Sequence, residues 1–330
     1  MNNMNPSISI IILNWNGWED TIECLESLYQ INYPTYNIIV VDNGSSDESI
    51  NKIKEYCEGK IVPNSLFFKY NPKNKPIKLF EYSKNESESI KNKEITRLSS
   101  SEKLVLIKND MNYGFAEGNN IGMKYALEAL NPDYILLLNN DTVVNKDFLG
   151  QLVELAETNE KIGIVGPKIY YYDFEGRNDV VANLGGKVNL NKYPGYYDLT
   201  EISNVEDYND IIECDWVSGA AMMMKSRQIP IKFLNNELFF GNEDVDLCIK
   251  LKEQGYRVVS VLNSNIWHKE GISRKKRSSA LIKKVLLEID TNLKFLKFHK
   301  KHYYSFLPIY IIQIIKLYSV IIIKRFFKSK

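Results

Sequence analysis

The chain has 330 residues, which is long enough for one large domain with a full hydrophobic core, or for a domain plus an appendage. A hydrophobic content of 44% and a charged content of 25% are ordinary for a globular protein and argue against a disordered or fibrous chain. The four cysteines are scattered, without a C-x-x-C pair or clustered histidines; they are Cys24, Cys57, Cys214 and Cys248. This distribution excludes a disulfide framework and a zinc site, and it indicates a reducing compartment.

The net charge of +1 conceals an uneven distribution. Residues 274–330 contain 15 Lys or Arg and 2 Asp or Glu, a net +13, so the rest of the chain carries −12. Such a basic segment predicts an anionic partner, with a membrane surface and nucleic acid as the candidates. The first strand is expected directly after the N-terminus, so we expect no cleavable signal peptide and predict a cytoplasmic protein.

The first part of the chain alternates apolar strands with amphipathic helices. Residues 7–13 form a continuous apolar run that predicts a buried strand, and residues 18–30 have the apolar spacing of a helix. A second strand is expected over 37–41, and the Ser45–Glu48 pair has the spacing of a capping box that opens the next helix. This alternation predicts right-handed βαβ units and a parallel sheet.

Residues 60–103 interrupt the alternation. They contain three prolines and a polar stretch, 83–101, that is rich in Asn, Ser, Lys and Glu. We interpret this segment as an insertion, partly mobile, in an otherwise compact domain. The alternation resumes with a strand at 103–107 and a helix at about 116–130.

A short apolar run at 134–138, which ends in Asn139, Asn140 and Asp141, is the most informative stretch of the chain. Such a run predicts a strand that is buried on both faces, as in a parallel sheet. Polar residues at its carboxyl end open into the crevice where α/β proteins bind ligands. A carboxylate flanked by amides is a candidate oxygen ligand for Mg²⁺ or Mn²⁺ that also holds a diphosphate. The alternative is an ordinary strand–turn–helix boundary.

The second half is less regular. Residues 170–208 are rich in Tyr, Gly and Asn, which predicts hairpins and loops over a site rather than a new domain. The other expected elements are a helix at 147–157, a strand at 162–166, an apolar segment at 216–225, a short helix at 243–254 and a strand at 256–262 that leads to Trp267 and His268.

Seven pieces of the chain together resemble the family 2 glycosyltransferases, which have a nucleotide-sugar-binding GT-A fold, and within them the rhamnosyltransferase-like members. The pieces are Ile11–Asn16, Val41–Asp47, Asn112–Asn120, Leu138–Asp141, Trp216–Ala220, Gly241–Asp246 and Trp267–Gly271. The resemblance implies a GT-A-type α/β domain at 1–272, with an insertion at about 60–103 and a mostly parallel, Rossmann-like sheet flanked by helices. A basic, apolar helical tail at 273–330 falls outside it.

The resemblance assigns the donor pocket. The donor-binding residues that it implies are Asn14, Asp42, Gly114, Asn119, Asn120, Asn140 and Asp141. A carboxylate at the position of Asp42 can accept hydrogen bonds from a uracil or thymine N3–H or from a ribose hydroxyl. Its alternative role is to shape a turn with Asn43 and Gly44. Gly114 and Gly118 flank an expected helix start, where the backbone can approach a ligand and the helix dipole favours anions.

The resemblance also implies a divalent cation, Mn²⁺ or Mg²⁺, held by Asp141 and His268. Asp141 is the final carboxylate of the family's D-x-D motif, whose first acidic residue is replaced here by Asn139. That replacement lowers the negative charge of the site and puts strict metal dependence in question. His268 and Gly271 match the family's His-x-x-Gly pattern, and a neutral imidazole suits Mn²⁺-like ions.

The acidic group at 243–246 is the candidate for proton abstraction. Carboxylates that lie close together repel, so one pKa rises while another group stays ionised, which suits a general base. By resemblance, Asp244 is the base and Glu243 orients the acceptor or the base; the alternative is an acidic helix N-terminus favoured by the dipole. Trp216 and Gly219 are expected on the acceptor side, with core packing as the alternative for Trp216.

The tail contains a very apolar run, 306–323, which Gln313 and Lys316 interrupt and basic residues flank. Gln313 and Lys316 fall on one helical stripe, which suits a helix that lies in an anionic membrane interface. A full membrane span and a helix packed on the domain or on a second subunit are the alternatives. Such a long apolar run argues against nucleic-acid binding.

The combined prediction is an inverting glycosyltransferase on the cytoplasmic face of a membrane. It would move a sugar from a UDP- or dTDP-linked donor to a hydroxyl of a glycan, a lipid-linked molecule or another acceptor. The rival interpretation is a non-catalytic sugar-nucleotide-binding or scaffold protein of the same fold, which only Asn139 favours.

Overall fold

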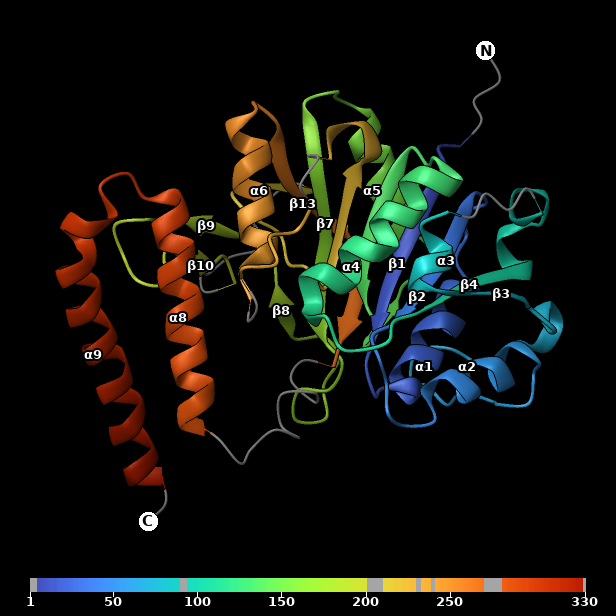
Figure 1. Ribbon diagram of the computed structural model, residues 1–330, viewed down its shortest axis with the longest axis horizontal. Coiled ribbons are helices and arrows are strands. Elements are labelled where there is room, and N and C mark those ends of the chain that lie inside the picture. Colours follow the sequence, from blue (N-terminus) through green and yellow to red (C-terminus); the bar gives the residue numbers. More distant parts are fainter. Residues whose placement is uncertain are drawn as a thin grey trace.

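The structure is a computed structural model that describes residues 5–89, 94–200, 210–229, 233–238, 241–269 and 281–328. Its centre is a mixed sheet with the strand order β11-β13-β7-β12-β5-β1-β2-β4-β3, flanked by helices (Figure 1). The strands of this order are β1 (Ile8–Asn14), β2 (Tyr36–Asp42), β3 (Lys78–Ser83), β4 (Lys103–Lys108), β5 (Tyr134–Asn139), β7 (Ile162–Tyr171), β11 (Ile211–Cys214), β12 (Ala221–Lys225) and β13 (Arg257–His268). Short strands beside it are β6 (Thr142–Val144), β8 (Val181–Asn183), β9 (Gly186–Val188) and β10 (Tyr196–Asp198).

The helices that cover the sheet are α1 (Trp18–Leu28), α2 (Ser49–Cys57), α3 (Lys84–Ser87), α4 (Gly114–Tyr125), α5 (Phe148–Glu157) and α6 (Glu243–Glu253). Because side chains alternate along a strand, Ile8, Ile10 and Ile12 pack with residues of α1, α2 and α5, whereas Ile11 packs with residues of α4 and α6. Both faces of β1 are therefore buried. This explains why its sequence is continuously apolar rather than alternating.

Strands β3, β4, β2, β1 and β5 pair in parallel, as the strand–helix alternation predicted. Asn14 lies opposite Asp42, and Leu13 lies opposite Asn139. The polar residues that follow β1, β2 and β5 therefore meet at one edge of the sheet. The other half of the sheet is mixed, because β12 runs antiparallel to both β5 and β7.

The segment interpreted as an insertion contributes a strand of its own. Strand β3 pairs in parallel with β4, and the registered pairs run from Lys78 with Lys103 to Ser83 with Lys108. Before it, the buried Lys75 ammonium lies 3.3 Å from the buried carboxylate of Glu26 on α1. This part of the segment is thus anchored to the parallel half of the sheet; residues 90–93 of the predicted polar stretch lie outside the described residues.

Two helices, α8 (Leu281–His299) and α9 (Tyr303–Lys328), form an antiparallel pair beside α6 and β9–β10 (Figure 1). Phe295, Leu296 and Tyr310 are fully buried against the domain. Gln313, expected on the polar stripe, accepts a hydrogen bond of 2.7 Å from the backbone of Tyr193 and so faces the domain. No helix within the described residues has the length and hydrophobicity that a bilayer span requires.

Candidate functional site

A hydrogen-bonded network joins the carboxyl ends of β1 and β2. Asn14 Nδ2 donates to Asp42 Oδ2 over 2.7 Å, and the Ser45 hydroxyl donates to the same oxygen over 2.7 Å. The backbone N–H of Ser45 donates to Asp42 Oδ1 over 3.0 Å, while Thr21 Oγ1 donates to Asn14 Oδ1 over 2.8 Å. The structure therefore brings together Asn14 and Asp42, two of the predicted donor-binding residues.

Asp42 is completely buried, and both of its oxygens accept hydrogen bonds from the protein. These contacts are those of the alternative role, in which Asp42 shapes the turn that follows β2. Its contact with a nucleotide stays a prediction. Trp15, in the loop after β1, is 40% exposed and presents an aromatic surface at this edge, although we assigned it no role from the sequence.

Asn139, Asp141 and His268 meet where β5 and β13 end. His268 Nε2 lies 3.0 Å from Asp141 Oδ1 and 3.4 Å from Asn139 Nδ2. Burial alone would raise the pKa of Asp141, but the hydrogen bond and charge of His268 outweigh it and hold the pKa below its usual value. The sequence prediction placed Asp141 and His268 together, and here they are in direct contact.

This pair fits a divalent cation. A carboxylate oxygen and a neutral imidazole nitrogen are both ligands for Mn²⁺-like ions, and Asp141 Oδ1 and His268 Nε2 lie 3.0 Å apart, so both would be available to one ion. Across the described ranges, no three His, Cys, Asp or Glu side chains gather as a metal-binding group. The pair would leave most positions of the ion to a diphosphate and water, which is the usual arrangement for Mg²⁺-type sites.

Lys269, which sequence reasoning left without a role, lies at the same edge. Its ammonium is 2.6 Å from Asp20 and 2.5 Å from Glu23, both on α1, and its backbone N–H donates to the carbonyl of Asp141 over 3.0 Å. Burial lowers the pKa of Lys269, but these two carboxylates outweigh it and the net shift is upward. Lys269 therefore ties the His268 strand end to α1. Asn140 reinforces this edge by donating to Thr21 Oγ1 over 3.0 Å.

The predicted donor motif on α4 makes mainly internal contacts. Gly114 opens the helix with a φ of +82°, which glycine adopts without strain, and a Cβ on Gly118 would lie 2.5 Å from Leu13. Asn119 is buried and donates to the Phe115 carbonyl over 2.9 Å. Asn120 donates to the Leu234 carbonyl and accepts from the Leu234 N–H, both over 2.9 Å. These amides hold the helix and the 233–238 segment, and their contact with a donor stays a prediction.

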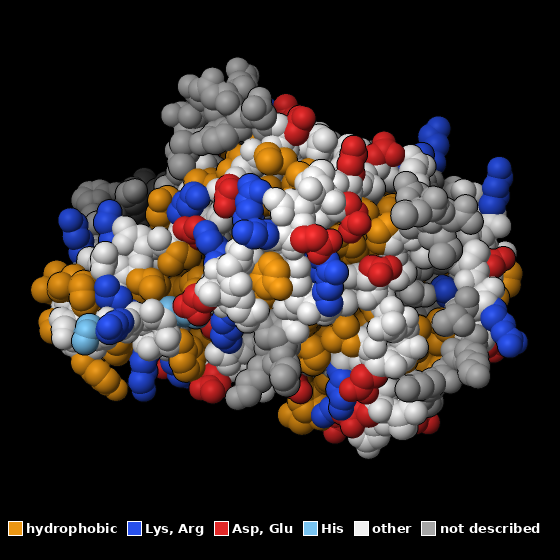
Figure 2. Space-filling model, turned by 90° about the horizontal axis from the view of Figure 1, so that it is seen from above, with side chains coloured by type: hydrophobic (Ala, Val, Ile, Leu, Met, Phe, Trp, Pro, Cys, Tyr) orange, Lys and Arg blue, Asp and Glu red, His pale blue; other side chains and the backbone are white. Residues whose placement is uncertain are grey.

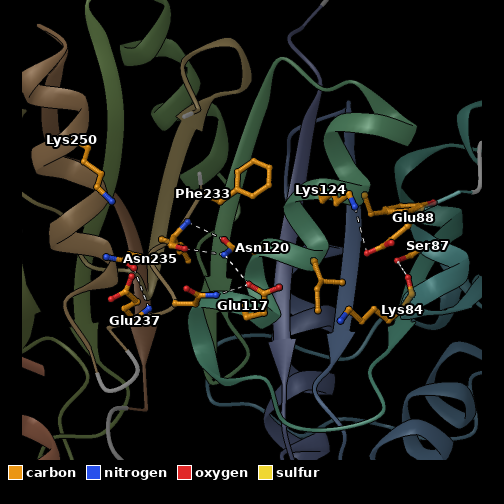
Figure 3. A pocket seen from close by; sticks show the side chains of 14 residues that line it. Lys84, Ser87, Glu88, Glu117, Asn120, Lys124, Phe233, Asn235, Glu237 and Lys250 are labelled. Carbon is orange, nitrogen blue, oxygen red and sulfur yellow. Dashed lines mark hydrogen bonds and ion pairs between the residues drawn. The ribbon is translucent and has the colours of Figure 1, made fainter. Parts of the chain in front are cut away.

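A cavity of about 570 Å³ lies over the outer side of α4 (Figure 3). Its lining comes from α3, α4, α6 and the 233–238 segment, and the charged side chains among it are Lys84, Glu88, Glu117, Lys124, Glu237 and Lys250. Of the predicted site residues, Asn120 alone lines it. The cavity is thus separate from the strand ends that carry Asp42 and Asp141.

Asp244, the predicted base, and Gly219, predicted for the acceptor side, are in direct contact, and both roles stay predictions. The Gly219 N–H donates to Asp244 Oδ2 over 2.8 Å, and the Val245 N–H donates to Asp244 Oδ1 over 2.8 Å. The next residue, Ala220, accepts a hydrogen bond of 2.9 Å from the Asn139 N–H. The adjacent residues Gly219 and Ala220 therefore connect Asp244 to Asn139 at the end of β5. Trp216 is buried in the core, with its ring against Gly186 and edge-on to Tyr196, which is the packing alternative.

Glu243 and Asp244 occupy different environments. Glu243 is 4% exposed, and burial first, then the charge of Asp244, raises its pKa to about 8. Glu243 is therefore largely protonated at neutral pH, whereas both carboxylate oxygens of Asp244 accept hydrogen bonds from backbone N–H groups. The raised pKa of Glu243 matches the expectation for one carboxyl of the group, and the role of Asp244 as the base stays a prediction.

The raised pKa of Glu243 predicts a pH-dependent stability. The folded protein binds a proton at Glu243 that the unfolded chain releases near pH 4.5, so the stability that this proton supplies is lost as the pH rises through about 8. Glu243→Gln removes the titrating carboxyl and with it this pH dependence. We expect the free energy of unfolding of the variant, relative to that of the unaltered protein, to be up to about 4 kcal/mol higher at pH 9 than at pH 5. Urea unfolding at both pH values measures this, and parallel stability–pH curves would contradict it.

Two family profiles match the chain. The one described as glycosyl transferase family 2 matches residues 9–78. The one described as glycosyltransferase like family 2 matches residues 91–286, which is more than half of the chain.

Among curated relatives, the low-salt glycan biosynthesis hexosyltransferase Agl10 of Haloferax volcanii is 21% identical over 256 residues. The alignment covers 77% of this chain and 64% of Agl10, so the chain spans less than two thirds of that relative. A protein of Sinorhizobium fredii, y4gI, is 30% identical over 151 residues, which are 43% of this chain and 16% of y4gI.

Two solved structures have a similar fold. The mannosyltransferase PcManGT of Pyrobaculum calidifontis, in complex with GDP-Man and Mn²⁺, has a TM-score of 0.55 and 14% identity, covering 91% of this chain and 66% of that one. GalNAc-T7 with UDP, GalNAc and Mn²⁺ has a TM-score of 0.53 and 14% identity, covering 81% and 44%. The predicted fold class is confirmed.

Proposed function

The chain belongs to glycosyltransferase family 2, and from this premise we propose that it transfers a hexosyl group from a nucleoside diphosphate sugar to a hydroxyl of a glycan or lipid-linked acceptor. One observation carries the proposal: the Asp244 carboxylate, fixed by the Gly219 N–H, lies one backbone hydrogen bond from the end of β5, where Asp141 contacts His268. A base and a diphosphate-binding edge are the two parts that such a transfer needs.

In the proposed reaction the acceptor hydroxyl gives its proton to Asp244. Its oxygen forms a bond to the anomeric carbon, and the bond from that carbon to the diphosphate oxygen breaks with its electrons on the nucleoside diphosphate. Attack from the side opposite the leaving group inverts the anomeric centre. The neutral Glu243 can donate a hydrogen bond, which suits it to orient the acceptor or Asp244.

Asp141 and His268 would hold the divalent cation, and the cation would supply positive charge to the departing diphosphate. Mn²⁺ is present in the complexes of PcManGT and GalNAc-T7, which favours a cation for this chain as well. Those two proteins were solved with a GDP-Man and a UDP ligand, respectively, so GDP is tested below beside UDP and dTDP. The predicted UDP or dTDP donor and the rhamnosyltransferase-like character are part of the proposal.

Binding of the donor nucleotide tests the proposal before any acceptor is known. UDP, dTDP and GDP are titrated calorimetrically into the purified protein with Mn²⁺, and we expect one of them to bind at one molecule per chain. The matching nucleoside without its diphosphate is the control, and it should bind more weakly because it lacks the charged group that the cation holds. A protein that binds none of the three diphosphates would contradict the proposal.

A non-catalytic sugar-nucleotide-binding protein is the second candidate, and the specific observation in its favour is Asn139 in place of a carboxylate. Such a protein would bind a nucleoside diphosphate but would not release one from a nucleotide sugar. Measuring binding and release on the same sample separates the two functions.

We also propose that α9 rests on an anionic membrane surface. One face of α9 carries four exposed apolar or aromatic side chains, with the exposed fraction of each in parentheses: Tyr304 (71%), Ile311 (47%), Ile312 (66%) and Ile315 (62%). Figure 2 shows hydrophobic and basic side chains side by side at the end of the molecule where α8 and α9 meet. An apolar helical face with neighbouring Lys or Arg is the composition of an interfacial helix.

Vesicle sedimentation tests this location. The unaltered protein is expected to bind vesicles that contain anionic lipid better than zwitterionic ones, and high salt should reduce the difference. A variant with Ile312→Glu and Ile315→Glu should bind about tenfold more weakly, because two exposed apolar side chains are replaced by charges that the surface repels. The control is Leu66→Glu, since Leu66 is 76% exposed elsewhere on the protein. Equal vesicle binding by the unaltered protein, the double Glu variant and Leu66→Glu would rule out this face of α9 as the membrane-binding surface.

A further inference from the structure

The first turn of α6 begins in an unusual way. Gly241 and Asn242 both have left-handed backbone conformations, with φ of +121° and +73°, and no side chain caps the helix from its N-cap position. This turn carries Glu243 and Asp244, so its position decides where the proposed base lies. Two contacts from α8 hold it in addition to the hydrogen bonds within the helix.

The first contact joins Asn242 to α8. Asn242 Nδ2 donates to Asn292 Oδ1 over 2.7 Å, and both residues are buried. Asn292 Nδ2 in turn donates to the hydroxyl of Tyr193 over 3.1 Å. Asparagine tolerates the left-handed conformation, and here its amide also reaches a partner 50 residues later in the chain.

The second contact lies one helical turn later. Asp246 is completely buried, and its Oδ1 is 2.8 Å from His299 Nε2 at the end of α8. Its other oxygen is 2.6 Å from the Lys250 ammonium. Because a buried carboxylate is stable only with such partners, the His299 contact fixes the second turn of α6 relative to α8.

Helix α8 is itself firmly placed. Phe295 and Leu296, which lie between Asn292 and His299, are fully buried, and the Phe295 ring is edge-on to Tyr196. The buried Phe295 and Leu296 anchor α8 on the domain, and the contacts of Asn292 and His299 on either side of them hold α6. The tail thus contributes directly to the geometry of the candidate base.

We propose that Asn292 and His299 are positioning residues for acceptor deprotonation, acting through Asn242 and Asp246 to hold the α6 turn that carries Asp244. This inference rests on the proposed function. It gives the C-terminal helices a part in transfer itself, separate from any membrane contact of α9.

The test uses the full chain and pairs each disruptive change with a conservative one. His299→Leu keeps an apolar contact for the neighbouring Phe295 ring but removes the N–H donor, whereas His299→Gln keeps a donor near the Nε2 position. Asn242→Gly keeps the left-handed backbone and removes the amide, and Asn292→Leu removes its partner. The readouts are kcat for transfer and the Kd for the donor nucleotide.

We expect kcat to fall about 10- to 100-fold in His299→Leu, Asn292→Leu and Asn242→Gly, since a displacement near 1 Å costs up to about 10²-fold. The nucleotide Kd should change less than about twofold, and His299→Gln should recover most of the activity. The double variant Asn242→Gly with Asn292→Leu should lose little more kcat than either single variant, because both changes break the same contact. Unchanged kcat, or an equal loss of kcat and nucleotide binding in every variant, would overturn the positioning role. Absence of transfer by the unaltered protein would instead overturn the proposed function, and this role with it.

Discussion

Asp244→Asn is expected to lower the rate of sugar transfer by about 10²- to 10⁴-fold while leaving nucleotide binding intact. General-base assistance typically contributes a factor of this size, and an amide cannot take the proton. The replacement is nearly isosteric, and its carbonyl oxygen can still accept the hydrogen bond from the Gly219 N–H. Initial rates at saturating donor measure the effect, and calorimetric titration of the nucleoside diphosphate checks that the donor site is unchanged.

Glu253→Gln is the matched control, because it makes the same carboxylate-to-amide change at an exposed position on the same helix. It should transfer sugar at the rate of the unaltered protein. Asp244→Asn turnover close to that rate would remove Asp244 from the role of base.

Removal of the divalent cation is expected to have the second large effect. EDTA should weaken binding of the nucleoside diphosphate and abolish transfer, and Mn²⁺ or Mg²⁺ should restore both, because the diphosphate needs a counter-ion. Asp141→Asn should lower the affinity of the nucleotide in Mn²⁺ by at least about tenfold, since it removes the one carboxylate that contacts His268 among the described residues. Titrations with and without EDTA measure both effects.

Asn139→Asp offers a change in the opposite direction. It restores a second carboxylate 3.4 Å from the His268 imidazole, so we expect tighter binding of Mn²⁺. The control is Asn263→Asp, which adds the same charge at an exposed position on β13. Binding and turnover that EDTA leaves unchanged would mean that Asn139 marks a metal-independent site.

The parallel half of the fold was predictable because its signals are local. Strands such as β1 and β5 are buried on both faces, so their sequences are continuously apolar and end abruptly in polar residues. Since the carboxyl ends of parallel neighbours meet, Asn14 at the end of β1 lies beside Asp42 at the end of β2. Asp141 and His268 were grouped by the resemblance alone, because β5 and β13 are not neighbours in the sheet and His268 reaches this edge through the pairing of β13 with β6. Strand β12 lies antiparallel between β5 and β7, and no local pattern in its sequence indicates that position or direction.

The roles of the amide side chains were less predictable. An Asn in a glycine-rich motif can bind a ligand or a backbone group, and sequence alone does not distinguish the two. Asn120 bonds both backbone groups of Leu234, which is 114 residues away. Asn43, which we expected only to shape a turn, donates to Asn112 and accepts from Asn109, so it joins the end of β2 to the loop before α4.

The tail shows the same limit. Its apolar content predicted a helix, but not which side of the helix faces the domain. Gln313 accepts a hydrogen bond from the Tyr193 backbone, whereas Ile312 and Ile315 are exposed. The 189–196 segment, rather than the average hydrophobicity of the helix, therefore determines which face of α9 packs on the domain. Asn292 and His299 gave no sequence signal at all, since their partners lie on α6.

Release of free nucleotide from a panel of nucleotide sugars tests the central claim most directly. The purified full chain is incubated with Mn²⁺, an acceptor extract and UDP-, dTDP- or GDP-linked hexoses, one at a time, beside Asp244→Asn. The account predicts that one donor releases its nucleoside diphosphate, that the sugar is found on the acceptor, and that Asp244→Asn reduces both by at least about 10²-fold. A protein that binds a nucleoside diphosphate but releases none from any donor would contradict it, and so would release that is equal in the variant.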